Sequence, residues 1–135
     1  MPYAIADLRT LDSLTIAKLK SLGIRTTDKF LECAKSPRGR RELAEKTGFD
    51  ERCILRWANL VDRMRIKGIG EDYAGLLEAA GVDTVRELKY RNPGRLAKAM
   101  ARVNTQRKLV RLLPSEKAVV RWIDTARKLP IKISY

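Results

Sequence analysis

The feature of this sequence that most limits how it can fold is an internal repeat. Residues 19–26 read LKSLGIRT and residues 77–84 read LEAAGVDT, so a leucine, a glycine, an apolar residue and a threonine recur at matching positions. Each copy also has an apolar side chain four positions after its threonine, Phe30 in the first and Leu88 in the second. Self-similarity of this kind is typical of chains built from copies of one supersecondary unit.

A second pair of matching segments defines the extent of each copy. Residues 56–63 and 121–128 both begin with an arginine followed by a tryptophan, and we predict that both tryptophans anchor a core. The second copy carries an insertion at residues 104–113. The predicted organisation is a first unit at residues 4–63, a second unit at residues 64–129 and a C-terminal tail at residues 130–135.

Within each unit the apolar residues recur with the period of an α-helix. One stripe at positions i, i+3, i+4 and i+7 consists of Tyr73, Leu76, Leu77 and Ala80. Helix starts are also marked, with predicted caps at Ser36, Asn92 and Ser115 and a capping box at Thr84 and Glu87. The chain has no convincing alternating strand. We therefore predict an all-α fold of two tandem helix-hairpin-helix (SAM-like) units packed as one compact domain.

The residue types that usually carry catalysis and metal binding are scarce. The chain has no histidine, which removes the commonest general base and the commonest metal ligand. Cys33 and Cys53 are its only thiols, and two thiols alone cannot complete a tetrahedral zinc site. Without a secretion signal, we expect both thiols to be reduced. We predict a protein that is not an enzyme and has no metal, no cofactor and no small-molecule substrate.

The sequence also lacks the marks of a membrane or secreted protein. No apolar run approaches the roughly 20 residues that a membrane span requires. Residues 1–7 lack the basic region and apolar stretch of a signal peptide. We expect a cytoplasmic protein without a membrane partner.

The net charge is the main clue to a partner. The chain has 29 Lys and Arg against 16 Asp and Glu, which gives a formal net charge of +13. Self-repulsion of this size costs stability unless a partner uses the charge. Nucleic acid is the commonest such partner, and an acidic protein or an anionic membrane face is the alternative.

Residues 66–70 read IKGIG, which is the pattern of a helix-hairpin-helix turn. We expect Gly68 to permit a tight turn, Ile69 to fill the core between two helices, and Gly70 to let a backbone approach closely. Backbone N–H groups at the start of the next helix would then favour an anion such as a DNA phosphate. Two acids follow directly, so phosphate contact and simple helix packing are equally supported for Gly68 and Gly70. The predicted nucleic-acid-binding residues of this turn are Lys67, Gly68 and Gly70.

The strongest candidate for binding is the basic stretch from residue 86 to residue 111. It holds nine positively charged residues and one acid, Glu87. Four of the nine follow helical spacing and would form one continuous stripe if Arg91 joined the helix. The alternative is a solvated helix face, but the one-sided charge favours binding. The predicted nucleic-acid-binding residues here are Arg91, Arg95, Lys98, Arg102, Arg107, Lys108 and Arg111.

The rest of the sequence gives no sign of sequence-specific recognition. A smaller basic cluster is diluted by acids and is interpreted as an exposed helix start; it consists of Lys35, Arg38, Arg40 and Arg41. The aromatic residues mostly fall in core stripes, which leaves few to stack on unpaired bases. No helix start concentrates Asn, Gln and Arg as a base-reading helix does.

Several segments together resemble a known family. They are residues 57–70, residues 73–85, Arg91-Asn92-Pro93 and Pro114-Ser115, and the family is a bacterial domain of unknown function, DUF4332. The second unit is more distantly similar to the N-terminal helical domain of RecA-family recombinases and to the C-terminal domain of the RNA polymerase α subunit. The resemblance implies a tandem helix-hairpin-helix fold, and those relatives contact the DNA backbone through hairpins and also dock proteins.

The leading hypothesis is therefore non-sequence-specific binding of double-stranded DNA through the basic face, with help from the hairpin at Gly68 and Gly70. The rival hypothesis is a protein-interaction adaptor whose basic face docks an acidic partner or a DNA-processing enzyme. RNA binding is a third possibility.

Overall fold

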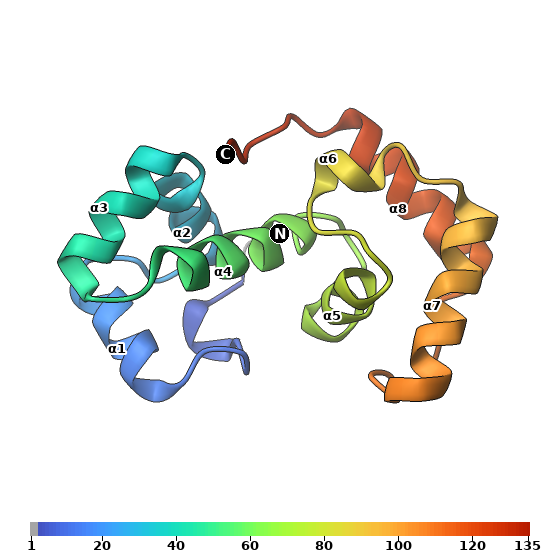
Figure 1. The fold of residues 1–135 in the computed structure, drawn as a ribbon, viewed down its shortest axis with the longest axis horizontal. Coiled ribbons are helices and arrows are strands. Elements are labelled where there is room, and N and C mark those ends of the chain that lie inside the picture. Colours follow the sequence, from blue (N-terminus) through green and yellow to red (C-terminus); the bar gives the residue numbers. More distant parts are fainter. Residues whose placement is uncertain (1–2) are drawn as a thin grey trace. The chain divides into compact units, whose positions relative to one another are not determined.

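The computed structural model describes residues 3–135, which form helices and no β-strand beyond one isolated bridge between Ala4 and Thr26. The all-α class predicted from the sequence is confirmed (Figure 1). In chain order the elements are a 3₁₀ turn η1 (Ile5–Asp7) and the helices α1 (Ser13–Ser21), α2 (Thr27–Ala34), α3 (Pro37–Thr47), α4 (Glu51–Arg63), α5 (Glu71–Ala79), α6 (Val85–Leu88), α7 (Pro93–Arg107) and α8 (Glu116–Lys128).

The chain separates into two compact units. Unit 1 runs to Asp62 and also includes Lys132–Tyr135, and unit 2 is Arg63–Ile131. The helix α4 therefore contributes its last residue to unit 2. The segment at residues 130–135, which the sequence sets apart as a tail, is shared between the units, because its last four residues belong to unit 1.

The helices begin where the sequence marks their caps. Each predicted cap accepts a hydrogen bond from the backbone N–H three residues on, Ser36 at 3.0 Å, Asn92 at 3.0 Å and Ser115 at 3.1 Å. Thr84 accepts from the Glu87 N–H at 3.3 Å, and Glu87 Oε2 accepts from the N–H of the residue before Thr84 at 2.9 Å. These bonds satisfy backbone donors that lack a partner at the start of a helix.

The core of unit 2 lies between α5, α7 and α8. Leu76 and Leu77 of α5 and Leu96 and Met100 of α7 are completely buried. Trp122 of α8 is buried as well, and its ring lies 5.4 Å from the Tyr73 ring. The tryptophan of this unit therefore has the anchoring position that the repeat predicts.

The tryptophan of unit 1 also contacts an aromatic ring, although it is less buried than Trp122. Trp57 of α4 is half-buried and meets Phe49 edge-on, with ring centres 5.5 Å apart and planes at 87°. Leu19 of α1, Phe30 of α2 and Ile54 of α4 are buried in the core of this unit. Such edge-to-face pairs add about 0.5–1.5 kcal/mol beyond the area they bury.

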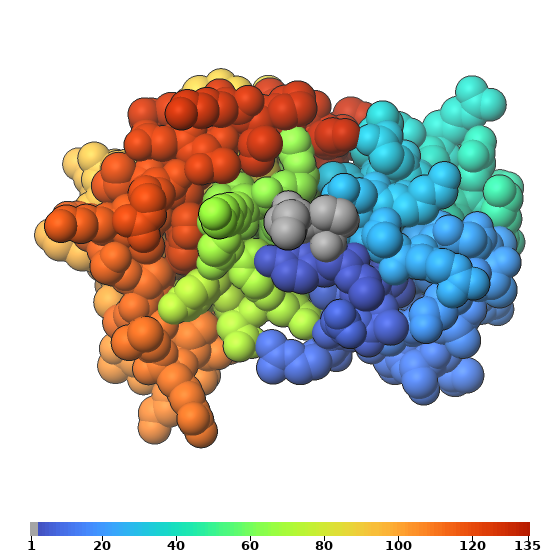
Figure 2. All heavy atoms as spheres, turned by 180° about the vertical axis from the view of Figure 1, so that it is seen from behind, coloured from blue at the N-terminus to red at the C-terminus, as the bar shows by residue number. Residues whose placement is uncertain are grey.

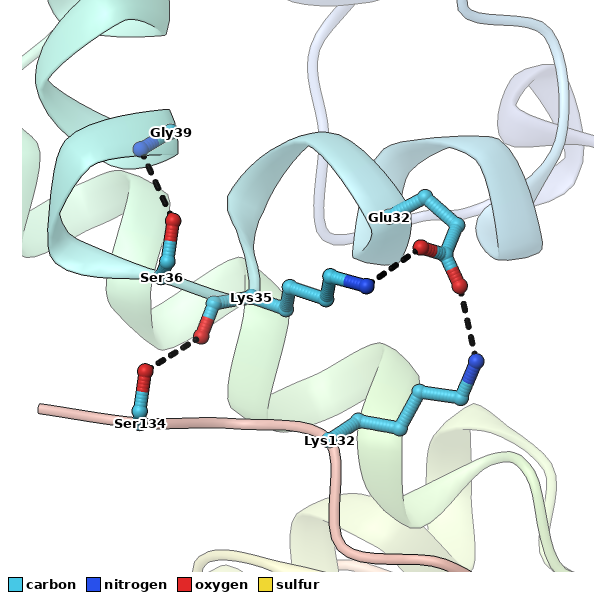
Figure 3. A network of polar contacts seen from close by, with 6 residues as sticks. All are labelled: Glu32, Lys35, Ser36, Gly39, Lys132 and Ser134. Carbon is cyan, nitrogen blue, oxygen red and sulfur yellow. Dashed lines mark hydrogen bonds and ion pairs between the residues drawn. The ribbon is translucent and has the colours of Figure 1, made fainter.

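The C-terminal residues are attached to α2 of unit 1 by a shared carboxylate. Lys132 Nζ lies 2.7 Å from Glu32 Oε1, and Lys35 Nζ lies 2.8 Å from Glu32 Oε2 (Figure 3). The Ser134 N–H donates to the Lys35 carbonyl at 2.8 Å. The hydrogen bond from Lys132, followed by that from Lys35, lowers the pKa of Glu32 from 4.5 to about 2.

Arg40 contradicts the interpretation of residues 35–41 as an exposed helix start. Its side chain is buried, and it donates to the Ala34 carbonyl at 2.9 Å and to the Ser134 carbonyl at 2.7 Å. Burial lowers the pKa of the guanidinium. The sequence could not show this, because one acceptor is 94 positions away in the chain.

Candidate nucleic-acid interface

Helix α7 carries four of the ten predicted binding residues, more than any other element. It begins at Pro93, whose fixed φ suits the first helical position, and it ends at Arg107. Its inner face is fixed in unit 2 by Leu96 and Met100, which are both fully buried. The opposite face is left to solvent.

That outer face presents three cations in a row. Arg95, Lys98 and Arg102 are all exposed, and their spacing places them on one side of the helix over a rise of about 10 Å. Within residues 3–135, no ion pair or side-chain hydrogen bond engages any of the three. No acid occurs in the sequence between residues 88 and 115. The row is therefore a positively charged surface that no ion pair engages within the described residues.

Arg91 does not extend this row, which corrects one sequence prediction. It precedes the N-cap Asn92 and so lies outside α7. Its side chain is half-buried, and its Nη1 lies 3.8 Å from the place where a Cβ on Gly81 would be. The predicted four-residue stripe is thus a three-residue stripe with Arg91 beside its start.

The remaining predicted cations continue from the end of α7 into the loop before α8. Arg107, Lys108 and Arg111 are exposed, and Lys108 has a left-handed backbone with φ of 49°. Because Arg107 lies five residues after Arg102, it is about 140° around the helix from the stripe. The side chain of Arg107 at the end of α7 therefore points in a different direction from those of Arg95, Lys98 and Arg102.

Two side chains hold this loop in place. Asn104 forms a paired contact with the Val110 backbone, donating to its carbonyl at 3.1 Å and accepting from its N–H at 3.0 Å. The Tyr73 hydroxyl of α5 donates to the Leu112 carbonyl at 2.9 Å. The predicted insertion at residues 104–113 thus consists of the last turn of α7 and a fixed loop, and Figure 2 shows the orange segment that contains it projecting from the body of unit 2.

Sequence reasoning missed three exposed apolar side chains beside these cations. Leu112 is 76% exposed and Leu113 is 39% exposed, although their loop is held at two points. Tyr90 is 76% exposed, with Lys89 Nζ 5.1 Å from its ring centre. Tyr90 is therefore an exception to the prediction that the aromatics fall in core stripes. The only signal in the sequence was that neither Leu112 nor Tyr90 belongs to a helical apolar stripe.

The turn between α4 and α5 has part of the geometry predicted for it. Gly68 has φ of 94°, as a tight turn requires, and Ile69 is fully buried. A Cβ on Gly68 would lie 3.2 Å from Trp122 Nε1, so this glycine also has a packing role. Gly70 differs from expectation, because its backbone is extended and a Cβ there would meet nothing within 4 Å. No part of the described chain needs the close approach that the sequence predicted at Gly70.

The ten predicted binding residues do not gather at one place. Lys67, Gly68 and Gly70 lie at the α4–α5 turn, and Figure 1 shows this turn apart from α7 within unit 2. The exposed cations of α7 and of the loop after it form the larger set. One acid does lie close to the start of α7, where Glu116 Oε1 is 3.0 Å from the position of a Cβ on Gly94.

The two units differ in how their charge is arranged. Unit 2 has 16 Lys and Arg against 7 Asp and Glu, whereas unit 1 has 13 against 9, so nine of the thirteen net charges belong to unit 2. Both units contain ion pairs, as between Arg38 and Glu42 at 3.2 Å in unit 1 and between Arg127 and Asp124 at 3.6 Å in unit 2, but within residues 3–135 no ion pair involves the exposed cations of α7 or of the loop after it. The basic face is therefore a property of unit 2.

Other kinds of site find little support in the described chain. Residues 3–135 contain no group of three or more Cys, Asp or Glu side chains that is placed to hold a metal ion. Cys33 and Cys53 are free thiols. None of the helices described is both long enough and apolar enough to span a membrane.

These features define a small all-helical protein of two units, with a basic helix and a basic loop on the second. A comparison with known protein families matches residues 12–129 to the domain of unknown function DUF4332. Because the match covers most of the chain, the protein belongs to this family. Neither the curated proteins nor the solved structures include a match to this chain.

Proposed function

We propose that this protein binds the backbone of double-stranded DNA without sequence preference, through the basic face of unit 2. The observation that supports the proposal best is the row of Arg95, Lys98 and Arg102, which is exposed and has no ion pair within the described residues. The row is about 10 Å long, and its three long side chains can reach successive phosphates along one strand. Arg107, Lys108 and Arg111 add positive charge at the end of α7 and in the loop after it, with Arg107 on a side of α7 different from that of the row.

The α4–α5 turn has a secondary role in this proposal. We interpret the repeats as helix-hairpin-helix units, which the positive φ of Gly68 and the buried Ile69 support for unit 2. Lys67 is exposed at this turn and adds one more positive charge. The distant similarity to the RecA N-terminal domain and to the RNA polymerase α C-terminal domain, and a cytoplasmic location, stay predictions. The proposed role is binding without catalysis.

The test is binding to a short random-sequence duplex, measured by fluorescence anisotropy at several salt concentrations. We expect the logarithm of the affinity to fall linearly with the logarithm of the salt concentration. Arg95→Ala, Lys98→Ala and Arg102→Ala together should make this slope shallower by up to about 2.7, since each neutralised phosphate contributes about 0.9.

The matched control removes the same charge from unit 1, through Lys18→Ala, Arg25→Ala and Lys29→Ala. All three side chains are exposed. If the two triple variants lose affinity equally, net charge alone drives binding and the basic face has no special role. Failure of the unaltered protein to bind duplex at low salt would refute the proposal and favour an acidic protein partner. Tighter binding of duplex RNA than of duplex DNA would overturn the choice of DNA.

A further inference from the structure

The α7–α8 loop holds an apolar side chain away from the protein. Its backbone is fixed on one side by the paired contact of Asn104 with Val110, at 3.1 and 3.0 Å, and on the other by the Tyr73 hydroxyl on the Leu112 carbonyl. Within this fixed loop Leu112 is 76% exposed, whereas Leu109 and Val110 are half-buried. Leu113, the next residue, is 39% exposed, so Leu112 is the most exposed apolar side chain of the loop.

The surroundings of Leu112 are positively charged. Arg111 precedes it directly, and Arg107 and Lys108 lie at the other end of the loop, all exposed. Within the described chain, no ion pair engages these three cations. An apolar side chain among cations is complementary to a polyanion that has an apolar interior close to its charged surface.

Duplex DNA is such a polyanion, because its stacked bases lie behind the phosphates and are reached through the grooves. Side chains such as leucine are known to enter between base pairs from the minor groove and to kink the duplex. An anionic membrane fits less well. Membrane-surface helices bury a broad apolar face, whereas the outer face of α7 presents Arg95, Lys98 and Arg102.

We infer that Leu112 is a wedge that enters between base pairs of duplex DNA and kinks it, while the cations around the loop hold the phosphates on either side. This inference rests on the proposed function and narrows it, because the expected preference is for a duplex that deforms easily and not for particular base edges. Unstacking costs least at flexible pyrimidine–purine steps and at mismatched bases. The preferred substrate is therefore a duplex with an easily unstacked step, and a stiff A-tract is the poorest one.

The experiment measures bending by energy transfer between dyes at the two ends of a duplex of about 20 base pairs, alongside affinity. One duplex carries central TA steps, one a central mismatch and one a central A-tract. The variants are Leu112→Ser and Leu112→Phe, and the control is Leu14→Ser, which changes a leucine that is 80% exposed in unit 1. Circular dichroism checks that each variant folds.

The unaltered protein and Leu14→Ser should bend the TA and mismatch duplexes and bind them about tenfold more tightly than the A-tract. Leu112→Ser should still bind, with the same salt slope, but without bending and without this preference, and Leu112→Phe should retain both. If the unaltered protein binds duplex DNA without bending it, or if Leu112→Ser bends it as much as the unaltered protein does, the wedge is refuted and backbone binding is not. No duplex binding at all would refute both. Leu112-dependent binding to phosphatidylserine vesicles without DNA bending would assign the side chain to a membrane instead.

Discussion

The paired contact of Asn104 with Val110 gives the clearest quantitative prediction. Asn104→Ala removes two partly buried hydrogen bonds of 3.1 and 3.0 Å and leaves both backbone groups of Val110 without them. At about 0.5–1.5 kcal/mol for each bond, opening of the loop should become easier by about 1–3 kcal/mol. Because 1.4 kcal/mol corresponds to a factor of ten, the Val110 amide should lose about 5- to 150-fold of its protection against hydrogen exchange.

Amide exchange followed by NMR is the right assay, because a loop can open while the helices stay folded. Asn104→Asp should fall in between, since a carboxylate still accepts from the Val110 N–H but no longer donates to its carbonyl. Thr105→Val is the matched control, because it removes a hydrogen bond of 2.9 Å from the next residue to Ala101 without affecting the loop. If Val110 keeps its protection in Asn104→Ala, or loses as much in Thr105→Val, this contact is not what holds the loop.

Two further predictions concern the turn of unit 2 and the C-terminal residues of unit 1. Gly68→Ala should lower the free energy of unfolding by about 1–2 kcal/mol, because Gly68 has a positive φ and lies close to the Trp122 indole. Gly70→Ala should change the free energy of unfolding by less than about 0.5 kcal/mol, because a Cβ there meets nothing. Equal effects of the two substitutions in urea unfolding would contradict this reasoning. The pKa of Glu32 is lowered when folded, so its stabilising contribution should be complete above pH 4.5 and be lost as the pH falls toward 2. Glu32→Gln should remove this part of the pH dependence of unfolding, and an unchanged profile would refute the role of the Lys132 contact.

The sequence predicted the helices well because their signals are local. Apolar spacing and capping residues act over three or four positions, and Ser36, Asn92 and Ser115 cap helices as expected. The exact start of a helix was harder to predict. Arg91 has the right spacing for the basic stripe, but the cap at Asn92 and the proline after it begin α7 two residues later.

The candidate site was less predictable, because what shapes it is not local. Tyr73 and Leu112 are 39 positions apart, and nothing in either segment signals their contact. Asn104 reads as an ordinary polar residue near a helix end, and its role depends on where the backbone of Val110 returns. The sequence therefore indicated a basic insertion without indicating that the insertion is a fixed loop with an exposed leucine.

The two copies of the repeat use the same template with different surface chemistry. In unit 1 the carboxylate of Glu32 is shared by Lys35 and Lys132, so part of its positive charge is used within the fold. In unit 2 the row of Arg95, Lys98 and Arg102 has no such partner in the described chain. Exposed ion pairs contribute little to stability, usually below about 1 kcal/mol. The absence of such pairs along α7 therefore affects the electrostatic field of the surface more than it affects folding. It follows that charge-removing substitutions along α7 should leave the free energy of unfolding nearly unchanged while they weaken binding to a polyanion.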